Sequence, residues 1–207
     1  GYTLTGVTSA SNYTISVTKG KLTITASNDL TVSASDVTKK YDGTAYGVSA
    51  SANVPTGTTI LYSLTNSTNP ADYTLTTSPT ATDATTGTTV YFVVTNPNYN
   101  PVFGSEQIVI NKRVVALTTA KDSKEYDTLP LTNAAWDFDT TGNDGFVAGQ
   151  GFATAAANGT ITNVGSTDNT FGYTLTPATS ASNYTINVTK GKLTITASND
   201  LSVGGSD

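Results

Sequence analysis

The chain has 207 residues, a net charge of −5, only 12% charged residues, and no Cys, His or Met. This composition excludes disulfide frameworks, thiol nucleophiles and histidine-based catalytic or metal sites. A nucleic-acid partner is not expected because few cations are present to neutralise phosphates, and no apolar run is long enough to insert into a membrane.

Threonine is the commonest residue and occupies 43 of the 207 positions. Because Thr is β-branched and suits a half-wet sheet surface, this composition favours β-strands. No segment carries an apolar stripe of helical period over three turns. The one helix-compatible patch, residues 153–157, is too short to form an isolated helix. We therefore expect an all-β chain.

The chain begins inside a repeat. Residues 1–36 recur as residues 172–207 at a constant offset of 171, with differences only at positions 6, 7, 16, 31, 33 and 34. In each copy, apolar side chains alternate with Thr and Ser on both sides of a Lys-Gly-Lys sequence, as in the stretch from Tyr13 to Ile24. This pattern predicts a hairpin with one buried face, and we expect Gly20 to supply the positive φ of its tight turn.

A shorter period lies within the long one. Tyr13, Tyr99 and Tyr184 are spaced by 86 and 85 residues, and the sequences Tyr41-Asp42-Gly43 and Tyr126-Asp127-Thr128 are 85 residues apart. This shared spacing indicates two different modules, each the size of a small β-sandwich. The predicted division is the closing strands of a preceding module at 1–27, module one at 28–113, module two at 114–197, and the start of a further module at 198–207. We expect the chain to be part of a longer array.

Within module one, β-branched residues predict strands near 30–32, 46–52, 58–64 and 88–95. The run from Val90 to Val94 is apolar on both faces, so we place it in the middle of a sheet. Module two should form strands near 114–117, 159–164 and 171–176, in addition to its closing strands. We predict antiparallel, β-sandwich-like (Ig-like) modules, with a β-grasp-like fold as the alternative.

The junctions between modules are short. Neither the stretch from Ile24 to Tyr41 nor the stretch from Ile110 to Tyr126 contains a flexible Gly/Ser run or a Pro-rich spacer. Both stretches carry residues typical of strands. We therefore expect the modules to meet nearly strand to strand, which limits bending.

Several motifs resemble a known family. They are Lys40-Tyr41-Asp42-Gly43-Thr44, Pro97-Asn98-Tyr99 and residues 107–113 in module one, and residues 124–127, 145–151, 163–166 and 183–186 in module two. These motifs resemble the YDG/MBG-type repeats of bacterial cell-surface adhesins and together span nearly the whole chain. The resemblance implies a secreted, extracellular protein at the cell surface whose repeats form a stalk and are sometimes grouped with mucin-binding modules. It brings no catalytic residues and no cofactor, and Thr128 departs from the family's usual Gly.

One acidic segment is similar to a calcium-binding loop, with Asp137, Asp139 and Asp144 as candidate ligands. The position that should supply a bidentate Glu is Ala148, and flanking helices are not expected. A solvated acidic turn is therefore the favoured interpretation, and no metal site is predicted.

An intramolecular isopeptide bond would need a Lys, an Asn or Asp, and a buried acid nearby. Lys40 and Asn111, near the two ends of module one, are the candidates. The equivalent positions of module two are Glu125 and Thr196, so the pair is not repeated. We do not expect this bond.

The sequence predicts a non-catalytic function. The acidic residues occur singly in turn-like segments, so no carboxylate pair for acid–base catalysis can be chosen. Tyr13, Tyr99 and Tyr184 could stack on carbohydrate, but their recurrence favours a packing role. We predict a stalk or filament segment whose partners are neighbouring repeats of the same chain or of like chains. The alternative is an adhesive module that binds host glycan or mucin.

Overall fold

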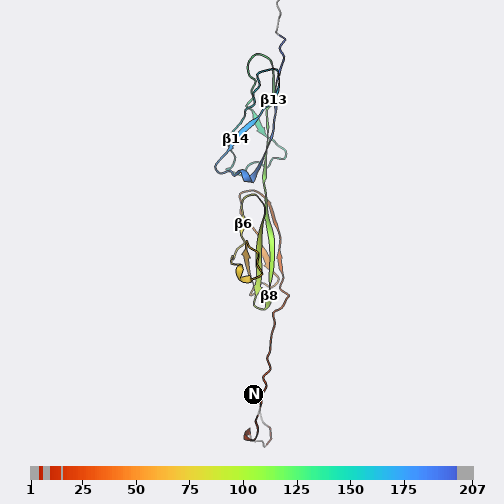
Figure 1. Cartoon of the computed structure of the whole chain (residues 1–207), viewed down its shortest axis with the longest axis vertical. Helices are drawn as coiled ribbons and strands as arrows, with labels where there is room; N and C mark the ends of the chain where they lie inside the picture. The colour runs from red at the N-terminus through yellow and green to blue at the C-terminus, as the bar shows by residue number, and fades with distance from the viewer. Residues whose placement is uncertain (1–4, 7–9, 15, 200–207) are drawn as a thin grey trace, which may run out of the picture.

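The computed structural model describes residues 5–6, 10–14 and 16–199 of the chain. Within this part, the strands that precede Lys112 pair only with one another, and so do the strands that follow it. We call residues 27–111 the first unit and residues 113–196 the second unit. Figure 1 shows the two units end to end along the long axis of the molecule, the first in orange to green and the second in green to blue.

The first unit is built on a long hairpin. Its elements are β1 (Val32–Ala34), β2 (Val37–Lys40), β3 (Tyr46–Gly47), β4 (Ala50–Ala52), β5 (Thr59–Ser63), the 3₁₀ turn η2 (Pro70–Asp72), β6 (Thr80–Ala81), β7 (Thr85–Asn96) and β8 (Tyr99–Asn111). Strands β7 and β8 form the hairpin at the centre of a four-stranded sheet of order β2-β8-β7-β5. The pairs β1–β4 and β3–β6 contribute side chains to the same core. The apolar run predicted to be central lies in β7, with Val90, Val93 and Val94 fully buried.

The second unit divides its strands among three small sheets. Its elements are β9 (Arg113–Thr119), β10 (Asp122–Glu125), β11 (Trp136–Phe138), β12 (Phe152–Ala157), β13 (Gly165–Asp168), β14 (Phe171–Leu175), the 3₁₀ turn η3 (Ala181–Asn183), β15 (Tyr184–Thr189) and β16 (Lys192–Thr196). The sheets have the orders β11-β9-β15, β10-β16-β13 and β12-β14. The helix-compatible patch at 153–157 is in strand β12, because antiparallel pairing with β14 overrides the helix preference of Ala. The strand predicted at 159–164 is reduced to a bridge between Ile161 and Leu131.

The predicted all-β, sandwich-like fold with antiparallel sheets is confirmed. The helical segments of the described chain are 3₁₀ turns of three residues, including η1 (Ala10–Asn12). A β-grasp-like arrangement, in which an α-helix crosses the sheet, is therefore not seen in this part. The structure adds three parallel pairs that the sequence did not predict: β2–β8, β9–β15 and β10–β16.

The hairpin predicted for the repeated stretch is wrong. Strand β15 pairs in parallel with β9, and β16 pairs in parallel with β10, in two separate sheets. The register is the same in both pairs, since Tyr184 lies opposite Arg113 and Leu193 lies opposite Asp122. The chain therefore runs side by side with itself over residues 113–125 and 184–196. Both stretches pass from the sheet β11-β9-β15 to the sheet β10-β16-β13, and we call the point where they pass the crossing. The period-2 pattern correctly predicted the buried face in the second copy of the repeat, but not in the first copy, where Leu22 and Ile24 are exposed, and it could not specify the strand partner.

The positive φ predicted for Gly20 is wrong, since neither Gly20 nor its counterpart Gly191 has one, and Gly191 serves close packing rather than a turn. The φ of Gly191 lies outside the left-handed region, but a Cβ at this position would lie 2.4 Å from the carbonyl carbon of Ala120. At the crossing, the Gly191 amide donates to Thr119 Oγ1 (2.9 Å), and the buried Asn169 side chain donates to the carbonyl of Ala120 (2.9 Å). These side chains satisfy backbone groups that leave the sheet ladders.

The first copy of the repeated stretch has a different environment from the second. Described residues 16–26 form no strand, and Leu22 and Ile24 are each 99% exposed, whereas their counterparts Leu193 and Ile195 are 0% and 1% exposed. The same sequence thus forms buried strands only beside β9, β10 and β13. Residues 1–4, 7–9 and 15 of the predicted closing strands, and residues 200–207 of the predicted next module, lie outside the described residues.

Candidate functional site

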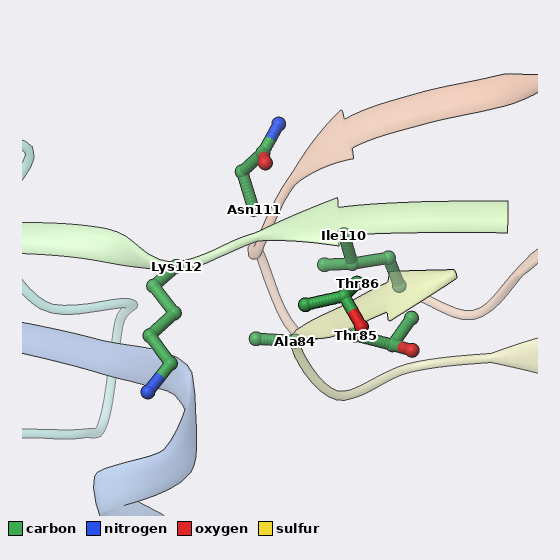
Figure 2. Close-up of a pocket in the computed structure, with 6 residues that line it drawn as sticks. All are labelled: Ala84, Thr85, Thr86, Ile110, Asn111 and Lys112. Carbon is green, nitrogen blue, oxygen red and sulfur yellow. The ribbon is translucent and has the colours of Figure 1, made fainter. Parts of the chain in front are cut away.

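The contact between the two units, which we call the joint, is centred on a very short link. Strand β8 ends at Asn111 and β9 begins at Arg113, so Lys112 alone connects them. Figure 2 shows Asn111 and Lys112 projecting to opposite sides of this link. A pocket of about 280 Å³ lies beside it, lined by Ala84, Thr85, Thr86, Ile110, Asn111 and Lys112. With one linking residue, the contacts around the joint decide how far the units can move.

Two tyrosines from different units meet at the joint. Tyr41 follows β2 in the first unit and Tyr184 begins β15 in the second, and their rings pack edge to face with centroids 5.6 Å apart. Each tyrosine is only 4% exposed. Ile110 and Val115, on either side of the link, are buried in the same cluster. The hydrophobic core is therefore continuous across the joint, and its burial favours the packed arrangement of the units.

One amide side chain connects the two tyrosine hydroxyls. Gln150 Nε2 donates to Tyr41 Oη (2.9 Å), and Tyr184 Oη donates to Gln150 Oε1 (2.5 Å). The Val147 amide in turn donates to Tyr184 Oη at 3.1 Å. Burial raises the pKa of Tyr184, which keeps its hydroxyl protonated and able to donate. The polar ends of both rings are thus satisfied inside the joint, as buried hydroxyls require.

A guanidinium group holds the loop before β12 against the link. Arg113 Nε donates to the carbonyl of Gly145 (2.8 Å), and Nη2 donates to the carbonyl of Asp144. Nη1 donates to the carbonyl of Tyr41 in the first unit at 3.4 Å. Because the guanidinium is planar and rigid, these bonds fix the loop relative to both units with little further loss of side-chain freedom.

An ion pair crosses the joint on the same side. Lys40 Nζ contacts Asp144 Oδ1, and the Val114 amide donates to Asp144 Oδ2 at 2.9 Å. The Lys40 contact first, and the Val114 amide second, hold the pKa of Asp144 below its ordinary value of 3.8. The Asp144 side chain is partly buried and that of Lys40 is about half exposed. Asp144 is therefore ionised at neutral pH and stabilises the joint.

A second polar contact lies beside a different strand. Asn183, which is buried, donates from Nδ2 to Asp83 Oδ1 (2.8 Å) and accepts the Ala84 amide at Oδ1 (2.7 Å). Ala84 immediately precedes β7, whereas Tyr41 immediately follows β2. Strands β2 and β7 flank β8 in the sheet order, so the joint is held on both sides of its covalent link. Bending toward either side must break one of these contacts.

The candidate calcium ligands are not brought together. Asp144 belongs to the joint, and Asp139 accepts a hydrogen bond from Thr118 at 2.6 Å. In residues 5–6, 10–14 and 16–199, no three His, Cys, Asp or Glu side chains group closely enough to hold a metal ion. The acidic segment thus supplies a cross-unit carboxylate.

The isopeptide candidates are neighbours in the sheet, but the Lys40 amine contacts a carboxylate. Lys40 and Asn111 lie opposite each other in the parallel pair β2–β8. The Lys40 amine, however, contacts Asp144 and is about half exposed. An isopeptide bond needs a buried, neutral amine beside the amide, so this geometry supplies an ion pair in its place.

Sequence reasoning missed four residues of the joint: Asp83, Arg113, Gln150 and Asn183. A signal for one of them was present, since Asn precedes Tyr at 12–13, 98–99 and 183–184. The Asn of this dipeptide makes the second contact, at Asn183. Asp83, Arg113 and Gln150 occur in no repeated dipeptide of this kind, and their roles depend on tertiary contacts.

Acidic pH should weaken the joint. Because the folded pKa of Asp144 is depressed, its stabilising effect is present at neutral pH and is lost as the pH falls through values below 3.8. We expect Asp144→Asn to lower the free energy of unfolding by about 1 kcal/mol at pH 7, as for a partly buried charged hydrogen bond. Urea unfolding of both proteins at pH 7 and pH 3 measures this difference, which should shrink at pH 3.

Asp137→Asn is the matched control, since Asp137 is exposed on β11. It should have little effect at either pH. A difference between wild type and Asp144→Asn that is the same at pH 3 and pH 7 would show that the charge of Asp144 does not stabilise the joint.

No helical segment in the described chain is long and apolar enough to cross a membrane. In comparisons with known proteins, no family of known proteins matches this sequence, and no curated protein is significantly similar to it.

Proposed function

We propose that this chain is a stiff, non-catalytic spacer: a stalk segment of a bacterial cell-surface protein of the YDG/MBG adhesin type. We propose that the stalk repeats are the predicted modules one and two, at 28–113 and 114–197, which correspond closely to the first and second units. Its partners are neighbouring modules, and its role is to hold another part of the protein away from the cell surface. It requires no cofactor.

The joint is the observation that carries this proposal. A one-residue link, a continuous apolar core and polar contacts on both sides of β8 all oppose bending between the units. A flexible tether would have a Gly/Ser-rich linker and few contacts across it. A stalk benefits from stiffness because its length then increases in proportion to the number of modules.

Stiffness can be measured directly in the full chain. Because the sequence contains no Cys, spin labels can be attached at Ser51→Cys and Asn187→Cys, both exposed strand positions in different units. Pulsed electron paramagnetic resonance should give one narrow distance distribution. Tyr41→Ala removes a buried ring and the hydrogen bond to Gln150, so we expect a clearly broader distribution.

Tyr13→Ala is the matched control, because Tyr13 occupies the same repeat position as Tyr184 but is exposed. It should leave the distribution narrow. A wild-type distribution as broad as that of Tyr41→Ala would contradict a stiff joint and the stalk function with it.

Exposed aromatic rings support a second candidate function, glycan binding. Trp136, Phe138, Phe146 and Phe152 line a groove of about 360 Å³ in the second unit, together with Gln150, Gly151 and Ala155. Phe138 is 45% exposed and the nearby Tyr173 is 43% exposed. Most of these rings pack edge to face, as in a core, and the Gln150 amide is already bonded to two tyrosines. Few polar groups are left to orient a sugar, so the stalk is the better-supported function.

A glycan array separates the two candidates. The stalk function predicts no bound glycan. The adhesive function predicts selective binding that is lost in Phe138→Ala and retained in Tyr13→Ala, which changes an exposed ring outside the groove.

A further inference from the structure

The far end of the second unit repeats the construction of the first unit at the joint. The Tyr126 amide donates to the carbonyl of Thr196 (2.9 Å), as the Tyr41 amide does to Asn111 (2.8 Å). Asp127 Oδ1 accepts a hydrogen bond from the Leu129 amide (3.0 Å), as Asp42 Oδ1 does from the Thr44 amide (2.8 Å). Thr128 adopts φ +68° where Gly43 has +81°, so the turn forms even though a β-branched residue replaces glycine.

This end differs from the joint in the exposure of its side chains. Tyr126 is 37% exposed, whereas Tyr41 is 4% exposed. Leu129 and Val164 are exposed as well. Tyr126 follows β10 and Val164 precedes β13, the two strands that flank β16. Tyr41 and Ala84 occupy the same places beside β8, and both contact the second unit.

The end of the first unit away from the joint carries the counterpart of Asn183-Tyr184, the part of the second unit that Tyr41 and Ala84 contact. Asn98-Tyr99 repeats Asn183-Tyr184, but Asn98 is exposed and Tyr99 only half-buried, whereas Asn183 and Tyr184 are both buried. Tyr99 begins β8 and forms a parallel bridge with Ser27, as Tyr184 begins β15 and pairs in parallel with Arg113. At both ends of the two-unit structure, these residues are therefore less buried than their counterparts in the joint.

Chain continuity identifies the occupant of this end. Residues 197–207 repeat residues 26–36, which lead directly into the first unit. Ser198 is the counterpart of Ser27, whose amide and carbonyl bond Asn98 and Asn100 at 3.0 and 2.9 Å. Strand β16 ends at Thr196, so Ala197 alone separates this strand from Ser198. Lys112 likewise separates Asn111 of β8 from Arg113 of β9 at the joint.

From these matches we propose that the end formed by Tyr126, Leu129 and Val164 is a docking face for a second copy of the first unit, with Tyr126 packed against the Asn98-Tyr99 of that copy. Glu125 occupies the place of Lys40, so the ion pair with Asp144 is not reproduced. This second joint is held by apolar and neutral polar contacts. The inference rests on the proposed stalk function and extends it from one joint to two alternating joints.

The test compares the full chain with an extended chain in which residues 37–113 follow Asp207. Hydroxyl-radical footprinting read by mass spectrometry reports the exposure of each tyrosine. In the extended chain, we expect the exposed fraction of Tyr126 to fall from 37% toward the 4% of Tyr41. The labelling rate of Tyr126 should fall in proportion. Tyr41 should label slowly in the unextended chain, where the second unit covers it, and Tyr173 should label rapidly in both chains, since it is 43% exposed.

A substitution in the docking face completes the test. Val164 is exposed in the described chain, so Val164→Asp should fold normally yet restore Tyr126 labelling in the extended chain. Val164→Thr, which keeps the volume without a charge, should retain most of the protection. Equal Tyr126 labelling in the two chains, or protection that survives Val164→Asp, overturns the second joint. Rapid labelling of Tyr41 in the unextended chain would instead overturn the first joint and the proposed function.

Discussion

Ile195→Ala should lower the free energy of unfolding by about 2–4 kcal/mol, the usual cost of emptying a buried aliphatic site. Ile195 is 1% exposed and packs with Leu193, Leu131 and Ile161 in a small cluster of the second unit. The cluster has few members, so little neighbouring structure can move in to fill the cavity. Urea unfolding monitored by Trp136 fluorescence measures the loss, because Trp136 lies in the same unit.

The chain contains its own control for this substitution. Ile24 occupies the same position in the first copy of the repeat but is 99% exposed. Ile24→Ala should therefore change the free energy of unfolding by less than about 0.5 kcal/mol. Thr194→Ala, at a half-buried position whose Oγ1 lies 3.2 Å from Ser166 Oγ, should cost less than about 1 kcal/mol. Equal losses at Ile195 and Thr194 would show that the buried face of β16 is assigned wrongly.

Local patterns were sufficient to predict which faces of the strands are buried. In the second copy of the repeat, alternation predicts five inward-facing side chains: Tyr184, Ile186, Val188, Leu193 and Ile195. Tyr184, Leu193 and Ile195 are buried, whereas Ile186 and Val188 are half-buried. The doubly apolar run of β7 was correctly predicted to be central in its sheet. These predictions succeed because side-chain direction alternates with period two whatever the partner strand is.

Strand partners could not be predicted in the same way. The two arms of the repeated stretch looked like a hairpin because a Lys-Gly-Lys sequence separates them. Their actual partners, β9 and β10, lie about seventy residues earlier in the chain, since Arg113 pairs with Tyr184 and Asp122 with Leu193. Parallel pairing of this kind leaves no local sequence signal, because no short turn connects the paired strands.

The candidate site shows the same limit. The acidic sequence around Asp144 makes it a candidate calcium ligand. Its contacts are instead with Lys40, 104 residues earlier in the chain, and with the amide of Val114. A carboxylate's role depends on which groups the fold places beside it. The repeated tyrosines could be found because the joint is built from positions that recur with the module.

Gly191→Ala is expected to destabilise the second unit by about 3 kcal/mol or more, the upper range for overpacking. The added Cβ would lie 2.4 Å from the carbonyl carbon and oxygen of Ala120 and 2.5 Å from the carbonyl oxygen of Thr119. These are backbone atoms at the point where two parallel stretches cross between sheets, and they cannot rotate away as a flexible side chain would. Moving them would also disturb the buried hydrogen bonds of Thr119 and Asn169.

Gly20→Ala separates this explanation from a general intolerance of the Lys-Gly-Lys sequence. Gly20 stands in the same sequence context, and a Cβ there would meet nothing within 4 Å. Neither glycine has a positive φ, so backbone strain contributes to neither substitution. Urea unfolding should therefore show a large loss for Gly191→Ala and almost none for Gly20→Ala. A small loss at both positions would mean that Gly191 does not lie in close contact with the backbone of Thr119 and Ala120.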